Sequence, residues 1–375
     1  MVRKKNILLT TNSSWNVVNF RSGLIKEISK SNFNFVVACP DDGYSKMIHS
    51  YNCKFVNTPI DSSGLNPFRD LITIFYYIYI LRRYKIDLVL SFTIKPNIYS
   101  SIAAKILNTP SIVNITGIGS AFINKNWLER LSTSLYRFAL SKTKLVFFQN
   151  QDDMELFISK NIAKQERSKI IPGSGVNIDF FEKFKTKHKE KNFFCFIMIS
   201  RLIVDKGLKE FLEASRLVKE KHPEIKFQIL GKKDSNISSI DEHNLNQYIE
   251  ENVVEILDFT DDVRESIHSA DCVVLPSYRE GLPKSLLEAM AMSKPILASD
   301  VPGCRNLVVD GENGFLFEVK NANALAQAML KIFNLDHTKI LEMGKFGKKF
   351  VTENFNETDV ISIYSREIDR ILWKS

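Results

Sequence analysis

The segment LPSYREGLPKSLLEAMA, residues Leu275–Ala291, contains two glutamates whose spacing could serve a ligand rich in hydroxyl groups. Glu280 lies in a turn, and Glu288 follows eight positions later in a predicted helix. A carboxylate on the helix can accept hydrogen bonds from two hydroxyls at once, as a ribose diol would offer. The carboxylate in the turn would lie nearer the reacting part of such a ligand. Pro283 suits the first helical position, and Gly281 lets the backbone approach a ligand closely.

A second segment, ISRLIVDKGLKEFLEA, supplies cations in a comparable setting. Arg201 follows a predicted strand and offers a planar fork for phosphate oxygens, and Lys206 precedes the next helix as a mobile point charge. The exposed amides at the start of that helix would add partial positive charge. Such a set is typical of a diphosphate site. The alternative in both segments is ordinary surface charge. Arg201 and Lys206 would then be two solvated cations, Glu280 a surface glutamate, and Glu288 a carboxylate near the start of a helix.

The sequence lacks the usual motifs of other phosphate sites. No Asp-x-Asp occurs, so the common carboxylate pair for a metal–diphosphate complex is missing, and we expect neither a metal ion nor another cofactor. The first predicted strand–helix turn, Thr10–Phe20, contains no glycine, and Gly117–Phe122 lacks the third glycine of the dinucleotide fingerprint. These features argue against a NAD site, and no Walker lysine loop occurs either.

The elements that must position these residues alternate between short apolar strands and helices, twice over. This alternation predicts an α/β protein with two Rossmann-like domains on parallel sheets, in which ligands lie beyond the carboxyl ends of the strands in a crevice between the domains. We expect domains at 1–175 and 192–355, a solvated linker over Lys183–Lys191, and a helix at 356–375 that packs back on the first domain. The main predicted strands are NILLTT, FNFVVACP, DLVLSF, SIVNIT and KLVFFQ in the first half, and FFCFIMIS, KFQILG, DCVVLPS and PILASD in the second.

The composition sets limits on partners and location. The chain of 375 residues is too long for one hydrophobic core, and 51 Lys+Arg against 43 Asp+Glu give a net charge of +8. That charge suits a phosphorylated substrate or a membrane surface, whereas no nucleic-acid motif accompanies it. The five cysteines are scattered without a Cys-x-x-Cys pair. The N-terminal apolar run is too short for a signal peptide, and the longest apolar run, Leu71–Leu81, is too short to span a bilayer, so we expect a cytoplasmic protein.

The motif EGLPKSLLE, with SRLIVDKG upstream, resembles the retaining glycosyltransferases of family four, which have the GT-B fold. The segment PILASDVPGCRNLVVDGENGFLF continues the resemblance through Gly303, Gly311 and Gly314. In the first half, NSSWNVVNFRSGLIKEI, FTIKPNIYSSIAAK and NITGIGSAF are similar to a subgroup that builds bacterial O-antigen, capsule or lipid-linked oligosaccharides. Some members add N-acetylgalactosamine to an undecaprenyl-diphosphate-linked sugar.

The resemblance implies a hexosyltransferase that needs no metal and moves a hexose or N-acetylhexosamine, from UDP-GalNAc or UDP-GlcNAc, to an undecaprenyl-diphosphate-linked sugar. It implies that Arg201 and Lys206 hold the diphosphate, that Glu280 contacts the donor sugar, and that further residues bind the donor, namely Glu288, Gly281, Leu282, Gly231 and Ser285. On the acceptor side it implies Asn12, Ser14, Lys95, Thr116 and Gly117. The family commonly has a histidine where this chain has Thr116 and Gly117, so no general base is assigned there.

A helix predicted over residues 126–142 could carry the chain to a membrane. Trp127, Leu131, Leu135 and Phe138 share one face, with a stripe of basic residues beside it, namely Arg130 and Arg137. We expect this helix to lie on the anionic inner surface of the membrane, which would make the protein peripheral on its cytoplasmic face. The alternative is that this face packs on the sheet.

Two rival functions stay open. A sugar-nucleotide 2-epimerase shares the fold but uses carboxylates and histidine around the sugar, and this chain has few histidines at strand ends. A nucleotide-sugar binding protein without catalysis would not need Glu280, Glu288, Arg201 and Lys206 together. Release of UDP, as opposed to formation of an epimer, would separate these functions.

Overall fold

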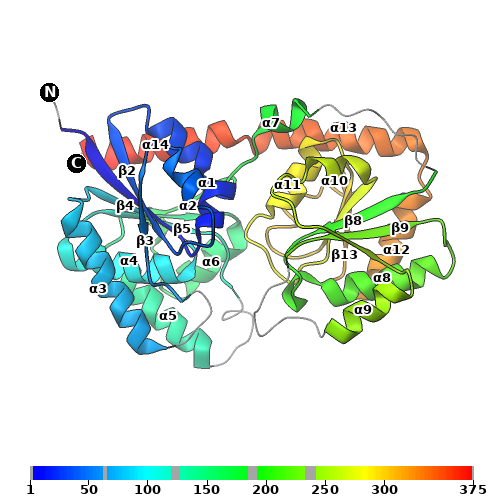
Figure 1. Cartoon of the computed structure of the whole chain (residues 1–375), viewed down its shortest axis with the longest axis horizontal. Helices are drawn as coiled ribbons and strands as arrows, with labels where there is room; N and C mark the ends of the chain where they lie inside the picture. The colour runs from blue at the N-terminus through cyan, green and yellow to red at the C-terminus, as the bar shows by residue number, and fades with distance from the viewer. Residues whose placement is uncertain (1–2, 62–65, 120–126, 185–191, 233–241, 374–375) are drawn as a thin grey trace. The chain divides into compact units, whose positions relative to one another are not determined.

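The computed structural model describes residues 3–61, 66–119, 127–184, 192–232 and 242–373 of the chain, which divides into two compact units (Figure 1). The first unit is Met1–Ser174 together with Glu357–Ser375, and the second is Gly175–Asn356. From residue 185 on, the predicted linker lies outside the described residues. No described helix is both long enough and apolar enough to cross a membrane.

The first unit is built on a seven-stranded parallel sheet of order β3-β2-β1-β4-β5-β6-β7. The order reverses between β1 and β4, and ligands of doubly wound sheets bind at such a switch point, beyond the carboxyl ends of the strands. The strands β4 and β5 are buried along their whole lengths, as is usual for the central strands of a parallel sheet covered on both faces. The strand bounds are β1 (Lys5–Thr10), β2 (Phe33–Cys39), β3 (Lys54–Asn57), β4 (Leu88–Phe92), β5 (Ser111–Ile115), β6 (Leu145–Phe148) and β7 (Ser168–Ile170).

Helices cover both faces of this sheet, each over its own hydrophobic core (Figure 1). One face carries α1 (Ser14–Ile28), α2 (Ser45–His49) and α14 (Glu357–Trp373). The other carries α3 (Pro67–Arg83), α4 (Ile94–Leu107), α5 (Trp127–Leu140) and α6 (Gln151–Ser159). A short 3-10 helix, η2 (Gln165–Arg167), precedes β7.

The C-terminal helix α14 belongs to the first unit because its apolar side is buried there. The ring of Tyr364 packs against Phe92 and Phe147, with centroids 6.1 and 5.0 Å away. Its hydroxyl accepts a hydrogen bond of 2.6 Å from the Asn114 side chain on β5. Val360, Ile368 and Ile371 enter the same core, so α14 completes a layer of this unit.

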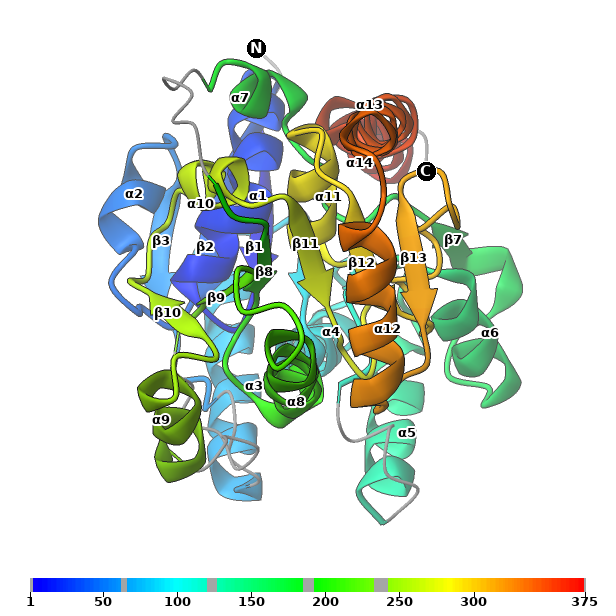
Figure 2. The same ribbon diagram turned by 90° about the vertical axis from the view of Figure 1, so that its right-hand side faces the viewer.

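The second unit repeats the plan with a six-stranded parallel sheet of order β10-β9-β8-β11-β12-β13, which reverses between β8 and β11. Its strands are β8 (Cys195–Ile199), β9 (Lys226–Leu230), β10 (Glu255–Leu257), β11 (Cys272–Leu275), β12 (Ile296–Ser299) and β13 (Gly314–Phe317). One core packs α8 (Leu208–Lys219), α9 (Glu242–Glu250) and α12 (Ala322–Phe333) on the sheet (Figure 2). The other packs α7 (Ile178–Glu182), α10 (Arg264–Ser269) and α11 (Lys284–Ala291), and α13 (His337–Asn354) reaches both cores.

The predicted α/β fold with two Rossmann-like units is therefore confirmed, with differences in detail. The sequence interpretation missed α13 as a separate helix, and it read the segment containing α7 as a break. The short helix α7 is ordered by burial of Ile178 and Phe181 in the second unit. The helix α11 begins at Lys284, so Pro283 is the residue that precedes it rather than its first member.

Candidate active site

Two loops meet at the switch point of the second unit. The first follows β8 and contains Arg201 and the 3-10 helix η3 (Val204–Lys206), after which α8 begins. The second follows β11, contains Glu280 and leads into α11. Because β8 and β11 are neighbouring parallel strands, both loops leave the same edge of the sheet. In doubly wound sheets this edge is where ligands bind.

Lys206 and Glu280 form an ion pair across these loops. The Nζ atom of Lys206 lies 2.5 Å from Oε1 of Glu280, and the two side chains are 21% and 12% exposed. A charge-assisted contact this short and this sheltered is stronger than a surface salt bridge. Lys206 carries three N–H donors, so it can keep its hydrogen bond to Glu280 and still donate another to a phosphate oxygen. The pair therefore places a cation and a carboxylate side by side at this edge of the sheet.

Tyr278 fixes the distance between the two loops. Its backbone N–H donates to the carbonyl of Asp205 at 2.9 Å, and its hydroxyl donates to the buried Glu210 carboxylate on α8 at 2.8 Å. Burial, followed by the Glu210 hydrogen bond, raises the pKa of Tyr278. Gly207, at φ 73°, allows the close approach, because a Cβ there would lie 2.0 Å from the carbonyl oxygen of Pro276. The sequence interpretation missed both Tyr278 and Glu210.

A third loop, after β12, packs against the backbone of the turn that carries Glu280. The backbone N–H of Glu280 donates to the carbonyl of Pro302 at 3.3 Å. Gly303 follows at φ 82°, and a Cβ there would lie 2.5 and 2.7 Å from the carbonyl oxygens of Gly281 and Glu280. The thiol of Cys304 is buried beside the pair: burial and then the charge of Glu280 raise its pKa, against the opposing charge of Lys206.

Glu288 lies on α11, where its side chain is 14% exposed and its carboxylate is 3.6 Å from Nζ of Lys284. Burial raises the pKa of Glu288 above its usual 4.5, the charge of Lys284 opposes this, and Asp262 adds to it. The carboxylate is therefore largely buried, and the neighbouring Lys284 compensates part of its charge. Hydroxyl groups of a ligand would supply the hydrogen bonds that burial removes.

If Glu288 binds a ribose, as the resemblance implies, the substitution Glu288→Gln is expected to raise the donor KM by about tenfold or more with little change in kcat, because a ribose is bound equally in the ground and transition states. Glu280→Ala should instead lower mainly kcat.

The same substitution of Glu288 should change stability with pH. Burial raises the pKa of Glu288, so the stability that this carboxyl group contributes is present below pH 4.5 and is lost as pH rises through its pKa in the folded state. The melting temperature of the variant should therefore be no lower than that of wild type at neutral pH. As pH falls to 4.5, the melting temperature of wild type should rise relative to that of the variant.

Steady-state kinetics and melting curves at several pH values check this expectation. The control is Glu213→Gln on α8, whose side chain is 43% exposed and pairs with Lys209 at 3.8 Å. A Glu288→Gln variant with unchanged donor KM and reduced kcat would contradict the ribose assignment.

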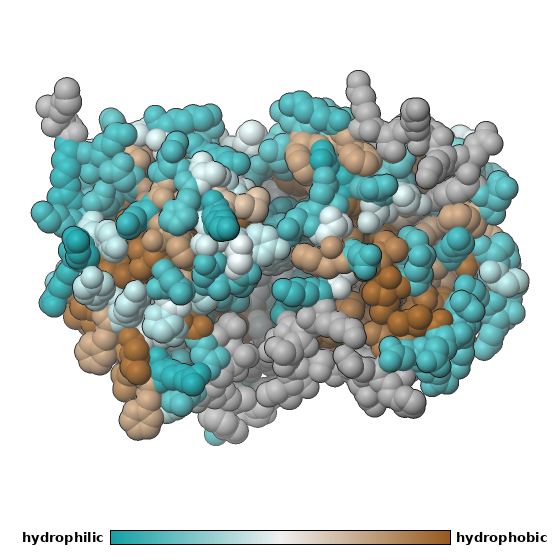
Figure 3. Space-filling view, in the orientation of Figure 1, coloured by the Kyte–Doolittle hydropathy of each residue, from teal (hydrophilic) through white to brown (hydrophobic). Residues whose placement is uncertain are grey.

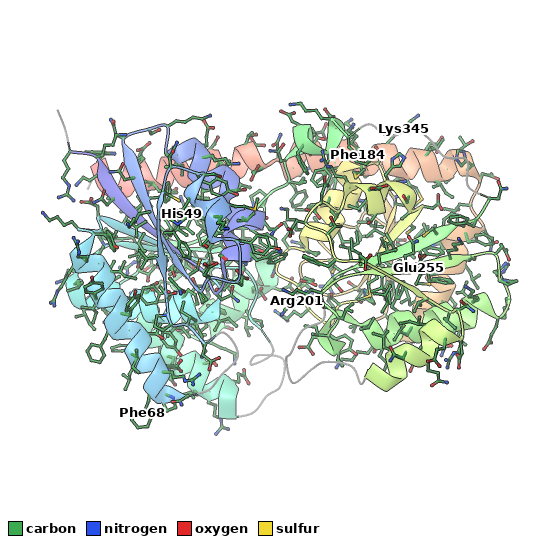
Figure 4. All side chains as sticks on the ribbon, viewed as in Figure 1. His49, Phe68, Phe184, Arg201, Glu255 and Lys345 are labelled. Atoms are coloured by element: carbon green, nitrogen blue, oxygen red, sulfur yellow. The ribbon has the colours of Figure 1, made fainter. Side chains whose placement is uncertain are left out.

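The other predicted donor residues surround this edge of the sheet. Arg201 is exposed on the loop after β8 (Figure 4). Gly231, after β9, allows the loop after β8 to approach its backbone closely, because a Cβ at this position would lie 1.8 Å from the carbonyl oxygen of Ser200. Gly281 and Leu282 form the turn between Glu280 and α11, and Ser285 is the second residue of that helix.

The predicted acceptor residues of the first unit lie at the carboxyl ends of β1, β4 and β5. Asn12, Thr116 and Gly117 are half-buried in the loops after β1 and β5. Lys95, in the first turn of α4, is 15% exposed and pairs with Asp70 of α3 at 3.0 Å.

Two residues of this region, Ser14 and Thr93, have features that the sequence did not predict. Ser14 is fully buried, and its hydroxyl bonds to Asp42 and accepts from the backbone of Tyr44 at 3.2 Å. Ser14 therefore holds the loop after β2 in place, and its contact with an acceptor stays a prediction. Thr93, directly after β4, adopts φ 67° and ψ 161°, a conformation that costs on the order of 1–3 kcal/mol in a residue other than glycine and that the sequence did not reveal.

The predicted membrane helix corresponds to α5. Leu131 and Phe138 are 46% and 55% exposed, so the alternative that this face packs on the sheet is wrong for these two residues. Leu135 of the same face does pack against the core, which Tyr136, Ala139 and Leu140 fill. Arg130 is exposed, and the Arg137 guanidinium donates to the carbonyl of Lys160 at 2.8 Å. Trp127 begins the helix, and its side chain lies outside the described part.

Relatives among known proteins cover most of the chain. The N,N'-diacetylbacillosaminyl-diphospho-undecaprenol alpha-1,3-N-acetylgalactosaminyltransferase of Campylobacter jejuni is 26% identical over 95% of this chain and 96% of its own. The UDP-Gal:alpha-D-GlcNAc-diphosphoundecaprenol alpha-1,3-galactosyltransferase of Escherichia coli is 25% identical over 74% and 73%.

Solved structures support the fold. The structure of Anabaena HepE in complex with UDP-glucose superposes with a TM-score of 0.78 at 19% identity, covering 97% of this chain and 99% of that one. Sucrose-phosphate synthase from Thermosynechococcus elongatus gives 0.80 at 16% identity, covering 99% and 100%.

Two family models match successive parts of the chain. The model "Glycosyl transferase 4-like" matches residues 6–150, and the model "Glycosyl transferases group 1" matches residues 179–350, which include both site loops. The chain therefore belongs to the GT-B glycosyltransferases that join a 4-like amino-terminal part to a group 1 carboxy-terminal part.

Proposed function

We propose that this glycosyltransferase moves an N-acetylhexosamine, from UDP-GalNAc or UDP-GlcNAc, to a sugar linked to a polyprenyl diphosphate, in the synthesis of a bacterial surface polysaccharide. The single observation that carries the donor site is the Lys206–Glu280 pair at the switch point of the second unit. The acceptor class rests on the two relatives whose names specify undecaprenyl-diphosphate sugars. A polyprenyl acceptor stays in the bilayer, so we place the enzyme at the cytoplasmic face of the membrane.

Within this proposal the ribose hydroxyls bind Glu288, and the diphosphate binds Arg201, Lys206 and the amides that begin α8. The turn at Gly281 and Leu282 and the second residue of α11, Ser285, border the sugar. Negative charge grows on the β-phosphate as its bond to the anomeric carbon breaks. Fixed cations and amides aimed at that charge are the largest source of catalysis that such a site can offer.

We further propose that transfer retains the anomeric configuration. The acceptor hydroxyl oxygen bonds to the anomeric carbon on the face that the phosphate leaves, its proton passes to the departing phosphate oxygen, and UDP is released. Glu280 contacts the sugar and orients Lys206, so neither a protein nucleophile nor a general base from the first unit is required. Asn12, Lys95, Thr116 and Gly117 are proposed to border the acceptor.

The test is a panel of UDP- and GDP-sugars with a short-chain polyprenyl-diphosphate-linked sugar as acceptor. We expect UDP release that depends on the acceptor, a product longer by one N-acetylhexosamine, and retained configuration by NMR. An epimerised UDP-sugar formed without acceptor would assign the chain to the 2-epimerases. Binding of the donor with no turnover of any acceptor would assign it to the binding proteins.

Chelation of divalent metal ions is expected to leave this transfer largely intact, because protein cations at Arg201 and Lys206 neutralise the diphosphate in the proposed site. The measurement is the initial rate after dialysis against EDTA, with and without added magnesium or manganese. Strict dependence on the added ion would show that these cations do not suffice.

A further inference from the structure

The outward side of α3 carries a stripe of large apolar side chains. Phe68, Leu71, Ile72, Phe75 and Tyr79 are 77%, 52%, 57%, 68% and 55% exposed. Their spacing of three, four, seven and eleven residues places them along one side of the helix. Figure 3 shows apolar residues gathered over α3, and Figure 4 shows Phe68 projecting away from the ribbon at the start of that helix. We call these five residues the α3 stripe.

The stripe makes no contribution to the core of the first unit. The opposite side of α3 supplies the core with Thr73, Tyr77, Ile80 and Leu81, which are at most 3% exposed. A helix that is apolar all round is normally buried on every side. An exposed contiguous apolar surface of this kind marks a site of interaction with a partner or a membrane.

The charges around the stripe are basic. Arg69 lies in the first turn of α3, where it pairs with Asp61 at 3.3 Å, and Arg82 and Arg83 lie in the last turn. The single acidic residue of the helix, Asp70, is paired with Lys95 at 3.0 Å. Phe75 and Tyr79, together with Arg82 and Arg83, line one shallow depression of the surface. Apolar side chains flanked by arginines are the pattern of helices that bind anionic membranes.

The neighbouring helices of the same layer continue this pattern. The helix α4 lies between α3 and α5 and exposes Ile106. On α5, Leu131 and Phe138 are exposed, and Nζ of Lys105 lies 3.6 Å from the centroid of the Phe138 ring. A groove where α4 and α5 end is lined by several cations, namely Lys105, Lys142, Lys144, Arg167 and Arg370.

We propose that the α3 stripe is the membrane-docking surface of the first unit, inserting into the interfacial region of a bilayer that contains anionic phospholipid. The proposal rests on the proposed function in one respect, since a polyprenyl-linked acceptor is confined to that bilayer. Charge complementarity favours lipid over a second copy of the chain. An isologous dimer through the stripe would bring the arginines of two chains, each with a net charge of +8, to the same interface.

The experiment is co-sedimentation of the full-length protein with vesicles of phosphatidylethanolamine and phosphatidylglycerol, compared with vesicles of phosphatidylcholine alone. Wild type should bind the anionic vesicles, less so as salt is raised. A stripe variant, Phe68→Ser with Ile72→Ser and Phe75→Ser, should bind on the order of a hundredfold more weakly, because three apolar side chains no longer enter the bilayer. Arg82→Glu with Arg83→Glu should also weaken binding, by roughly tenfold or more.

The matched control is Phe259→Ser with Leu341→Ser in the second unit, whose side chains are 45% and 50% exposed. This variant should bind vesicles as wild type does. Circular dichroism melts establish that the stripe variant is folded, and transfer to a water-soluble acceptor analogue should be unchanged in it. Failure of that transfer in wild type as well would count against the proposed function, while vesicle binding would still report on the stripe.

Two outcomes would overturn the proposal. The first is a wild-type protein that ignores anionic vesicles at low salt, or a folded stripe variant that still binds them like wild type. The second is a wild-type dimer in sedimentation velocity that the stripe substitutions convert to monomer without affecting vesicle binding, which would assign the stripe to a second copy of the chain.

Discussion

Replacing Lys206 with alanine is expected to lower kcat by on the order of a hundredfold or more, equivalent to about 3 kcal/mol of transition-state stabilisation. The physical reason is twofold. The cation that we propose faces the departing phosphate is lost, and Glu280, with a side chain only 12% exposed, loses its ion-pair partner at 2.5 Å. Arg201→Ala should also lower kcat, through the loss of the phosphate contact that we propose for it.

The measurement is steady-state transfer with saturating donor, together with a melting curve for each variant. The matched control is Lys209→Ala on α8, where Nζ lies 3.8 Å from Glu213 and the lysine is 67% exposed. This control removes a lysine–glutamate pair within α8, the helix that follows Lys206, and should leave kcat unchanged. A folded Lys206→Ala enzyme within about threefold of wild type would show that the pair is structural only.

A double-mutant cycle separates two possible roles of Glu280, which are to orient Lys206 and to contact the sugar. If Glu280 only oriented Lys206, then Glu280→Ala with Lys206→Ala should lose no more activity than Lys206→Ala alone. If Glu280 also contacts the sugar, as we propose, the double variant should lose clearly more. The cycle therefore distinguishes a positioning residue from a catalytic one.

The alternation of strands and helices predicted the central strands of both sheets and the loops that carry the site, but it missed the two edge strands of the first sheet, β3 and β7. Arg201 and Glu280 follow β8 and β11, and adjacent parallel strands bring their carboxyl ends to one edge. The direct pairing of Lys206 with Glu280 could not be predicted, because it depends on how closely the two loops approach. That distance is set by Gly207 and by the contacts of Tyr278, which join segments about seventy residues apart in the sequence.

The apolar run Leu71–Leu81 shows a different limit. Its hydropathy identified an unusual segment, but periodicity cannot assign sides to a helix that is apolar all round. In the structure Thr73 and Tyr77 face the core, whereas Phe75 and Tyr79 face outward. For α5 the amphipathic pattern was clearer, but the predicted face is divided: Leu131 and Phe138 are exposed, whereas Leu135 packs against the core of the first unit.

Replacing Gly303 with alanine is expected to disable the site without touching a charged residue. At φ 82° an alanine is strained, and its Cβ would lie 2.5 Å from the carbonyl oxygen of Gly281 and 2.7 Å from that of Glu280. Both contacts are with backbone, so the turn that carries Glu280 must move. A shift of about 1 Å in a catalytic group can cost on the order of a hundredfold in rate, and we expect a loss of that size in kcat.

Gly311→Ala is the matched control for this substitution. Gly311 has φ 77°, close to that of Gly303, but a Cβ there would meet no atom within 4 Å. Both variants carry the backbone cost of a positive φ, about 1–2 kcal/mol, and should lose stability for that reason. Only Gly303→Ala pushes on the Glu280 turn, so only it should lose most of its kcat while it remains folded. Equal activity of the two folded variants would show that this turn does not set the position of Glu280.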